Sequence, residues 1–259
     1  MSLLSDIIAR KVREVASLPS YSVERADRRS FVGAVMSRHP SLIAEIKPVS
    51  PLGGRLLRKR DIPAVIETYN RHAQAMSVLS DTATFGGGFD LLSFVRGRTD
   101  LPLLAKDFIL GERQIDAAAY HGADAVLLIA SLLDPSTLRR LSLHAIGLGL
   151  DVLIELHTVD DVTNMTSLLS ALTEAERSHV LVGINNRDLV TQTIDLTATE
   201  RLSDLLSDVS DRPVISESGI SRREDIQRLE RHVQGLLIGS ALLQSDDADL
   251  LLRTLFPSP

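Results

Sequence analysis

The stretch "ADAVLLIASLLDPSTLRRLSLHAIGLGLDVLIEL", residues 123–156, contains the repeating unit of the fold. Its two ends, "ADAVLLIA" (123–130) and "DVLIEL" (151–156), are short continuous apolar runs, which are typical of parallel strands covered on both faces. Between them, "LDPSTLRRLSLHAIGLG" (133–149) has a proline near its start and glycines near its end, the asymmetry that a helix favours. The stretch therefore predicts a strand, a helix and a second, parallel strand.

The same alternation extends in both directions along the chain. Apolar residues have helical spacing in "DIPAVIETYNRHA" (61–73), "ERQIDAAAYHG" (112–122) and "REDIQRLERHV" (223–233). Eight strands that alternate with helices at intervals of roughly thirty residues predict an α/β protein, a closed (β/α)8 TIM barrel. The rival fold, an open doubly wound sheet, would carry a G-x-G-x-x-G fingerprint after its first strand, where this chain has "KPVSPLGG". The six further predicted strands are "SLIAEIK" (41–47), "AMSVLS" (75–80), "LPLLAKDF" (101–108), "VLVGIN" (180–185), "RPVISES" (212–218) and "GLLIGS" (235–240).

No linker or low-complexity tract divides the chain, so we expect residues 1–259 to form a single barrel domain. Residues 1–40 precede the first strand and contain one amphipathic helix, within "MSLLSDIIARKVREV". We expect this segment to be an N-terminal helical extension packed on the barrel. Charged residues interrupt its apolar positions, so it predicts neither a secretory signal nor a transit peptide, and no run approaches the roughly 18 apolar residues of a membrane span.

The composition narrows the functional classes. The hydrophobic fraction of 44% and the charged fraction of 24% are those of an ordinary globular protein. A net charge of -6 argues against binding to nucleic acid or to an anionic membrane, although a local positive pocket can still bind an anionic small molecule. The absence of cysteine excludes disulfides and thiolate metal sites, and it fits a cytoplasmic location. We expect no cofactor and no metal, because Glu155 and His157 share a strand face without a third ligand.

Charged residues stand where the predicted strands end, and a barrel places its chemistry at the carboxyl ends of its strands. The first strand ends in Glu45 and Lys47, which point to the same face because they are two residues apart. Lys106 ends the third strand, Glu155 the fifth and Glu217 the seventh. Purely structural ion pairs are the alternative. Five ionisable residues at one end of a barrel favour an active site, because crowding separates their pKa values into acids and bases.

The last two strands carry a second signal. "ESGISRRED" (217–225) and "GSALLQSDD" (239–247) each place glycine or serine immediately before a predicted helix. Backbone N–H groups at a helix start bind anions, and barrels frequently bind phosphate after strands seven and eight. A plain tight turn is the alternative, and either motif alone is a weak signal, but the two together at these strands predict a phosphate site.

These motifs resemble those of the indole-3-glycerol phosphate synthase family. The matching stretches follow the family's order from the first strand to the last, and the set that ends in "GINNRDL", "ISESGI" and "LIGSAL" is the most specific. The resemblance implies the single-function enzyme of tryptophan biosynthesis. This enzyme closes the pyrrole ring of 1-(2-carboxyphenylamino)-1-deoxyribulose 5-phosphate with loss of carbon dioxide and water. The other matching stretches are "IAEIKPVSP", "AKDFI", "ADAVLLI" and "LIELH".

The resemblance also implies a role for each site residue. Lys106 is the acid for the carbonyl oxygen during ring closure, and Lys47 and Glu155 share the acid and base work of dehydration. Glu217 is expected to pair with Lys47. The implied catalytic residues are Glu45, Lys47, Lys106, Glu155, Asn185, Glu217 and Ser218. The implied substrate-binding residues are Ser50, Phe108, Arg187, Gly219, Gly239 and Ser240.

In this scheme Glu45 and Asn185 orient the substrate's hydroxyl and amine groups, and Phe108 stacks on the anthranilate ring. Ser218, Gly219, Gly239 and Ser240 form the phosphate cradle, with Ser50 contributing from the first loop.

Three positions depart from the family pattern. The first loop reads Ser50-Pro51-Leu52-Gly53-Gly54 where Ser-Pro-Ser followed by Lys and Gly is usual, and Val49 stands where a basic residue often does. Gly88 replaces a usual serine, and Gly86-Gly87-Gly88 predicts a mobile loop. We expect these changes to alter the Michaelis constant or turnover without changing the reaction.

Three other functions compete with this one. A Schiff-base aldolase would act through Lys47 or Lys106, but it leaves the "ESGI" motif unexplained. Phosphoribosylanthranilate isomerase would need a cysteine, which the chain lacks. A non-catalytic phosphosugar-binding barrel would lose no activity on mutation. The expected partner is a phosphorylated small molecule, with no nucleic acid and no membrane, and the resemblance implies a monomer while leaving a weak dimer open.

Overall fold

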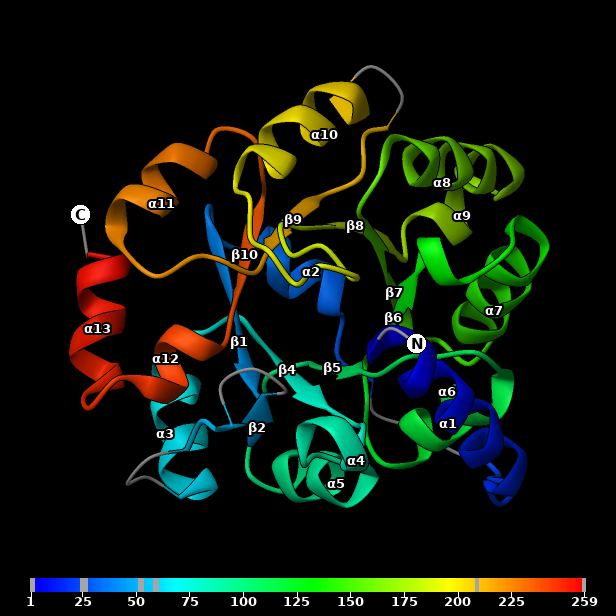
Figure 1. The fold of residues 1–259 in the computed structure, drawn as a ribbon, viewed down its shortest axis with the longest axis horizontal. Coiled ribbons are helices and arrows are strands. Elements are labelled where there is room, and N and C mark those ends of the chain that lie inside the picture. Colours follow the sequence, from blue (N-terminus) through cyan, green and yellow to red (C-terminus); the bar gives the residue numbers. More distant parts are fainter. Residues whose placement is uncertain (1–2, 24–27, 51–53, 58–60, 208–209, 258–259) are drawn as a thin grey trace.

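The computed structural model describes residues 3–23, 28–50, 54–57, 61–207 and 210–257. Within these residues, parallel strands close into a barrel in the order β1-β10-β9-β8-β7-β6-β5-β4. Each predicted strand is present, with ends within two residues of the expected ones, so the TIM-barrel prediction is confirmed (Figure 1). The barrel strands are β1 (Ser41–Ile46), β4 (Ala75–Leu79), β5 (Leu103–Lys106), β6 (Ala125–Ile129), β7 (Asp151–Leu156), β8 (Val180–Asn185), β9 (Val214–Glu217) and β10 (Gly235–Ile238).

Helices follow the strands around the outside of the barrel (Figure 1). An antiparallel pair of very short strands after β1, β2 (Val49–Ser50) and β3 (Gly54–Arg55), was not predicted. The rest of that loop, Pro51 to Gly53, and part of the basic run after it, Arg58 to Arg60, lie outside the described residues. The second helix before β1 was not predicted either, because the sequence indicated one helix in residues 1–40. The helices between the barrel strands are α3 (Ile62–His72), α4 (Thr82–Phe85), α5 (Phe89–Arg96), α6 (Glu112–Tyr120), α7 (Pro135–Gly147), α8 (Val159–Ala171), α9 (Glu174–Arg177), α10 (Thr197–Ser207) and α11 (Arg223–Leu229), with η1 (Ala130–Leu132) as a 3-10 turn, and α12 (Ser240–Gln244) and α13 (Ala248–Leu255) follow β10.

Capping side chains set the starts of several helices. Asp134 precedes α7 and accepts hydrogen bonds from the backbone N–H groups of Ser136 and Thr137, and Pro135 occupies the first position. Thr158 and Asp161 form a reciprocal capping box at the start of α8. These side chains satisfy N–H groups that have no partner inside the helix, so the chain turns from strand to helix at fixed residues.

Two apolar layers hold the barrel together. The outer layer fills the space between strands and helices and includes Val65, Leu141 and Leu202. The inner layer fills the barrel itself, and it includes Ile43, Leu104, Leu153 and Ile215. The interior is therefore a packed core, as expected of this fold, and polar chemistry is confined to the ends of the strands.

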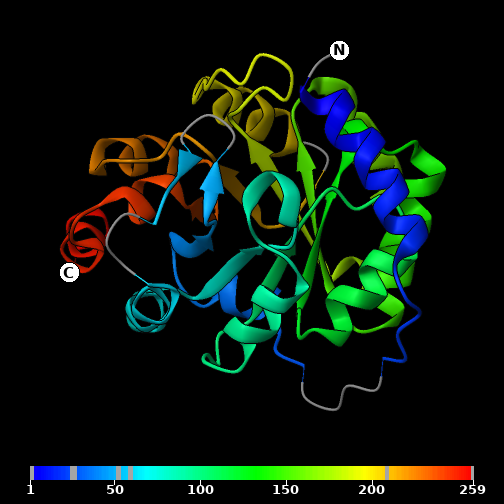
Figure 2. The same cartoon turned by 60° about the horizontal axis from the view of Figure 1, so that its bottom comes forward.

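Two helices precede β1 among the described residues, and their buried side chains reach opposite ends of the barrel interior. In α2 (Phe31–Met36), Phe31 and Val35 are fully buried in the inner layer and close the amino end of the strands. In α1 (Leu3–Ser17), Ile7 joins the same layer beside Phe108, just beyond the carboxyl end of β5. Figure 2 shows α1 running along the side of the molecule past α6 and α7, with its first residues at the carboxyl ends of the strands.

A buried lysine fastens α1 to the barrel. The side chain of Lys11 is 1% exposed, and its ammonium lies 2.8 Å from an oxygen of Asp81 and 2.9 Å from an oxygen of Asp107. Burial lowers the pKa of Lys11, but the two carboxylates outweigh it and raise the pKa above its usual value. Arg10, which precedes Lys11 in the helix, also bonds Asp81 at 3.1 Å. The extension is thus tied by charge to the loops after β4 and β5.

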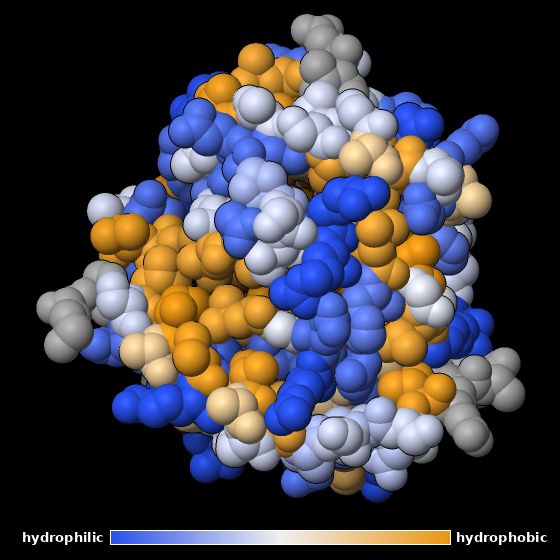
Figure 3. Space-filling model, turned by 90° about the vertical axis from the view of Figure 1, so that its right-hand side faces the viewer, coloured by the Kyte–Doolittle hydropathy of each residue, from blue (hydrophilic) through white to orange (hydrophobic). Residues whose placement is uncertain are grey.

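The outer surface is mixed in character on the side that includes α1, α7 and α8. A band of hydrophilic residues crosses this face, and hydrophobic residues lie on both sides of it, with the larger group on the left (Figure 3). No helix among the described residues has the length and apolar content needed to cross a membrane.

We predict that Lys11→Met lowers the free energy of unfolding by about 3–5 kcal/mol, because Asp107 would keep a buried charge without its ammonium partner and Asp81 would keep only Arg10. Urea unfolding of the variant and the wild type measures the difference. The matched control is Arg13→Met, a change of the same kind at an exposed position of the same helix. Equal stability of the two variants would contradict a fastening role for Lys11.

Candidate active site

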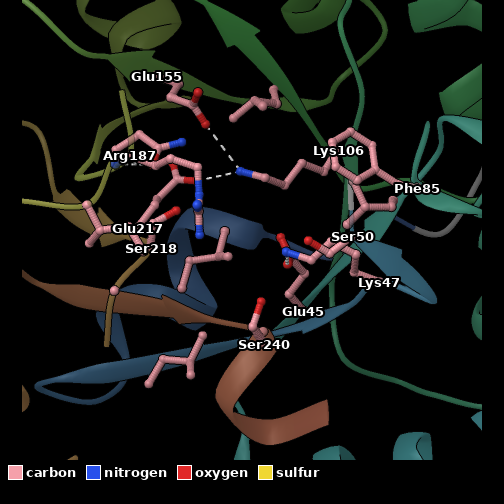
Figure 4. Close-up of a pocket in the computed structure, with 18 of the residues that line it drawn as sticks. Glu45, Lys47, Ser50, Phe85, Lys106, Glu155, Arg187, Glu217, Ser218 and Ser240 are labelled. Atoms are coloured by element: carbon pink, nitrogen blue, oxygen red, sulfur yellow. Dashed lines mark hydrogen bonds and ion pairs between the residues drawn. The ribbon is translucent and has the colours of Figure 1, made fainter. Parts of the chain in front are cut away.

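A cavity of about 410 Å³ opens at the carboxyl ends of the strands. Every site residue expected from the sequence lies on its wall (Figure 4). These residues come from β1, β2, β5, β7, β8 and β9, from the loops that follow barrel strands and from the start of α12. They are Glu45, Lys47, Ser50, Lys106, Phe108, Glu155, Asn185, Arg187, Glu217, Ser218, Gly219, Gly239 and Ser240.

The ammonium of Lys106 is the centre of the site. It lies 3.2 Å from an oxygen of Glu155 and 2.5 Å from an oxygen of Glu217. Figure 4 shows Lys106 reaching across the cavity from the side of Phe85 towards both carboxylates. Burial lowers the pKa of Lys106, but Glu217, Glu155 and Glu45 outweigh it and raise the pKa, so the ammonium stays charged at neutral pH.

A second ion pair lies beside the first. The ammonium of Lys47 is 2.6 Å from an oxygen of Glu45, as the shared strand face predicts. The expected pair of Glu217 with Lys47 was wrong, because Glu217 pairs with Lys106 instead. Strand spacing shows which side chains enter the barrel, but it does not show which of them meet across it.

The three carboxyl groups have different pKa values. Burial raises all three, but Lys47 and then Lys106 lower the pKa of Glu45 below its usual value. Lys106 and then His157 do the same for Glu155, which also accepts a hydrogen bond from Asn185. For Glu217 burial dominates and, with the nearby charge of Glu155, raises the pKa to about 8 in spite of Lys106. The site thus holds two carboxylates and one carboxyl that is protonated near neutral pH.

Two glycines make room for these carboxyl groups. A Cβ atom on Gly183, in β8, would lie 2.3 Å from Oε1 of Glu217, and one on Gly239 would lie 2.3 Å from Oε1 of Glu45. Real Cβ atoms essentially never approach another atom to within 3.0 Å, so either side chain would have to move. The need for glycine at these two positions cannot be predicted from the sequence, because each contact joins residues of two adjacent strands that are far apart in the chain.

The end of β9 has an unusual backbone. Ser218 has φ +66° and Gly219 has φ +85°, and a left-handed serine marks a held conformation. The buried side chain of Asn186 holds it: its amide donates to the carbonyl oxygens of Glu217 and Ser218, both at 3.0 Å. Asn186 was not predicted as a site residue, and it acts behind the cavity wall.

The expected helix starts at the phosphate end are only half right. Ser240 is the first residue of α12, directly after Gly239. In contrast, α11 begins at Arg223, several residues beyond Gly219, so the first motif forms a turn and not a helix start. Ser218 and Gly219 nevertheless face the same cavity as Gly239 and Ser240.

Apolar residues form the opposite wall. The rings of Phe85 and Phe108 are stacked, with centroids 6.3 Å apart and planes 19° apart. Leu4 and Ile7 of α1 also line the cavity. Phe85 and these two residues were not predicted, because they lie outside the strands and only the tertiary structure brings them to the mouth.

The loop with three consecutive glycines is tightly packed. The N–H groups of Gly86, Gly87 and Gly88 each donate a hydrogen bond to a backbone oxygen, and Gly88 bonds that of Leu79. A Cβ atom on Gly87 would lie 1.8 Å from the same Leu79 oxygen. The expected mobile loop was therefore wrong. The glycines let the backbone of this loop pack closely against that of Leu79, where a side chain would not fit.

The fold and this cavity define a class: a (β/α)8-barrel enzyme with paired lysines and carboxylates at the carboxyl ends of its strands. Among the described residues no group of three potential metal ligands occurs. The fold is similar to that of the tryptophan synthase A-subunit from Pyrococcus furiosus, at a TM-score of 0.62 with 16% identity over 84% of this chain and 98% of that one. A 3-hexulose-6-phosphate synthase gives a TM-score of 0.60 at 16% identity, over 83% of this chain and 97% of that one.

Sequence comparison makes the assignment specific. A family model described as indole-3-glycerol phosphate synthase matches residues 4–255. Proteins of that name from Bacillus velezensis and Exiguobacterium are 36% and 38% identical, over 98% of this chain and 99% and 96% of theirs. The chain belongs to the indole-3-glycerol phosphate synthase family. It is a decarboxylating lyase of tryptophan biosynthesis.

We predict that Gly183→Ala lowers kcat by about 100-fold, since the new Cβ displaces the Glu217 carboxyl from Lys106 and a shift of about 1 Å at a reacting group has that effect. Steady-state kinetics of the purified variant measures the change. The control is Gly147→Ala at the end of α7, where a Cβ atom meets nothing within 4 Å. Unchanged turnover in Gly183→Ala would show that the position of Glu217 does not matter.

Proposed function

We propose that the site residues divide the ring-closing reaction among them, with Lys106 as the acid of its first step. The observation that carries the proposal is the Lys106 ammonium, held charged between Glu155 and Glu217 at the centre of the cavity. The aromatic carbon of 1-(2-carboxyphenylamino)-1-deoxyribulose 5-phosphate attacks the C2' carbonyl carbon, and the carbonyl oxygen becomes negative. A positioned ammonium donates a hydrogen bond and then a proton to that oxygen.

The later steps need a base and a second acid. Loss of carbon dioxide restores electrons to the ring system, and the new hydroxyl group must then leave as water while a proton is removed. Glu155 is the proposed base, because its lowered pKa keeps it ionised. Lys47 is the proposed acid for the leaving hydroxyl, and it lies 2.6 Å from Glu45, which holds it in the cavity. Glu217 holds Lys106 in place.

The remaining residues bind the substrate. Phe85 and Phe108 offer an apolar wall for the anthranilate ring. Arg187, whose guanidinium is fixed by a 3.1 Å bond to the carbonyl oxygen of Gln192, is the proposed partner of an anionic substrate group. Glu45 and Asn185 orient its hydroxyl and amine groups. Ser218, Gly219, Gly239 and Ser240 form the proposed phosphate cradle, with Ser50 from the first loop.

We also propose a domain organisation, an oligomeric state and a class of ligand for the chain. Residues 1–40 are an extension of the barrel and not a separate domain, which is supported by the Lys11 ion pairs and by the contribution of Leu4 and Ile7 to the cavity wall. The proposed state is a monomer in the cytoplasm. The proposed ligand is a phosphorylated small molecule, with neither nucleic acid nor membrane as a partner.

We predict that Lys106→Met lowers the rate of ring closure by 100- to 10,000-fold, the usual contribution of a general acid. The chain contains no tryptophan, so indole fluorescence reports the product with almost no protein background. The control is Arg140→Met, which removes a surface cation paired with Glu112.

Retained emission in Lys106→Met would contradict the assignment of the acid. Borohydride trapping separates the aldolase alternative, since a Schiff base on Lys47 or Lys106 would leave a stable covalent adduct on the wild-type enzyme. We expect no adduct.

We predict that Ser240→Asp raises the Michaelis constant at least tenfold with little change in kcat, because a carboxylate at the start of α12 repels the substrate phosphate. Inhibition by inorganic phosphate should weaken by a similar factor. The control is Ser167→Asp, at an exposed position of α8. Equal phosphate inhibition in both variants would remove Ser240 from the cradle.

A further inference from the structure

His157 lies directly behind the proposed base and has no part in the proposed acid and base steps. It follows the last residue of β7, two positions after Glu155, so strand spacing puts both side chains on one face. Its Nε2 atom is 3.3 Å from Oε1 of Glu155. The imidazole does not line the cavity, and its side chain is only 8% exposed.

The imidazole is buried without the usual partners. Neither Nδ1 nor Nε2 has a hydrogen-bond partner among the described residues, although Nε2 lies 3.3 Å from Oε1 of Glu155. A buried polar group without a hydrogen bond is unfavourable, so it usually persists for a reason other than stability. The reason suggested by the geometry is the carboxylate next to it.

The backbone of His157 is fixed firmly enough to aim the ring. Its N–H donates to an oxygen of Asp161 at 2.9 Å, and the same oxygen accepts from the hydroxyl of Ser131 at 2.6 Å. Asp161 in turn belongs to the capping box that starts α8. The ring therefore sits at the junction of a strand and a helix, on a support that does not depend on Glu155.

The two oxygens of Glu155 face different cations or potential cations. Oε2 is 3.2 Å from the ammonium of Lys106, and Oε1 faces Nε2 of His157. The carboxyl groups of Glu45 in β1 and Glu217 in β9 are close enough to Glu155 for like charges to repel. Asp188, in the loop after β8, interacts electrostatically with His157. Burial raises the pKa of Glu155, and Lys106 first and His157 second lower it.

We propose that His157 is a positioning residue that keeps the Glu155 carboxylate ionised and turned towards Lys106. This inference rests on the proposed role of Glu155 as the base. Glu155 and Glu217 share the ammonium of Lys106, and the environment of each decides which of the two is ionised. His157 stands behind Glu155 and no such group stands behind Glu217 among the described residues, so the negative charge settles on Glu155 and the proton on Glu217.

The test is the pH dependence of kcat in His157→Leu, an apolar replacement of similar size. Loss of the imidazole should raise the pKa of Glu155, so the acid limb of the profile should move to higher pH by roughly one unit. The rate should recover at higher pH, where Glu155 ionises again. His157→Gln, which places an amide N–H near the position of Nε2, should show a smaller shift.

A titration that does not depend on turnover accompanies the kinetics. Carbon-13 NMR of glutamate carboxyl groups, with the Glu155 signal assigned by its loss in Glu155→Gln, reports the ionisation directly. The control is His144→Leu, which removes an imidazole paired with Asp116 on the outer helices, and both readouts should match the wild type.

The possible results separate the two proposals. An equal loss of rate at every pH in His157→Leu, or an unmoved Glu155 signal, would overturn the positioning role and leave His157 as packing. Full activity of Glu155→Gln would instead overturn the role of Glu155 as the base, whatever happens at His157.

Discussion

The ammonium of Lys106 lies between the buried carboxyl groups of Glu155 and Glu217, and the architecture of the mouth follows from the need to compensate these charges. Burying an ion without a partner is prohibitive, so each charged side chain at the top of the barrel requires another. The fold supplies the arrangement. Glu45, Lys106, Glu155 and Glu217 come from β1, β5, β7 and β9, which alternate around the barrel. Alternate strands of a barrel contribute to the same layer of interior side chains.

The same four strands also contribute the apolar layer directly below the charged one. Two residues before each of these four positions stand Ile43, Leu104, Leu153 and Ile215, all fully buried in the inner core. A shift of one residue in the register of any of these strands would turn its charged side chain away from the barrel interior. The apolar layer thus fixes the height and direction of the charged one, and Gly183 and Gly239 leave the space that its carboxyl groups need.

Much of this arrangement is predictable from the sequence. Continuous apolar runs identify the strands, and period-two spacing places Glu45 beside Lys47, which the structure confirms at 2.6 Å. Partner choice across the barrel is not predictable in that way, because it depends on strand order and stagger, and the expected pairing of Glu217 with Lys47 failed for this reason.

Residues that reach the site from outside the strands were missed for a related reason. Phe85 lies in a four-residue helix, and Leu4 and Ile7 lie in α1, where their apolar spacing indicates a packed helix face without saying what it packs against. Asn186 adjoins the predicted Asn185, but nothing in one sequence distinguishes an asparagine that faces the cavity from one that braces the backbone behind it.

The charge balance of the mouth also constrains how the substrate enters it. Four carboxyl groups (Glu45, Asp107, Glu155 and Glu217) and three cations (Lys47, Lys106 and Arg187) line the cavity and leave one negative charge in excess. The substrate adds a carboxylate and a phosphate that carries about -1.5 to -2 at neutral pH. The raised pKa of Glu217, about 8, removes that excess, because a protonated Glu217 still bonds Lys106 without repelling the incoming anion. The same proton could not sit on Glu155 without disabling the proposed base. A site that must hold an ionised base and admit an anionic substrate therefore needs two carboxyl groups with unequal environments around one lysine, and the imidazole behind Glu155 is one physical source of that inequality.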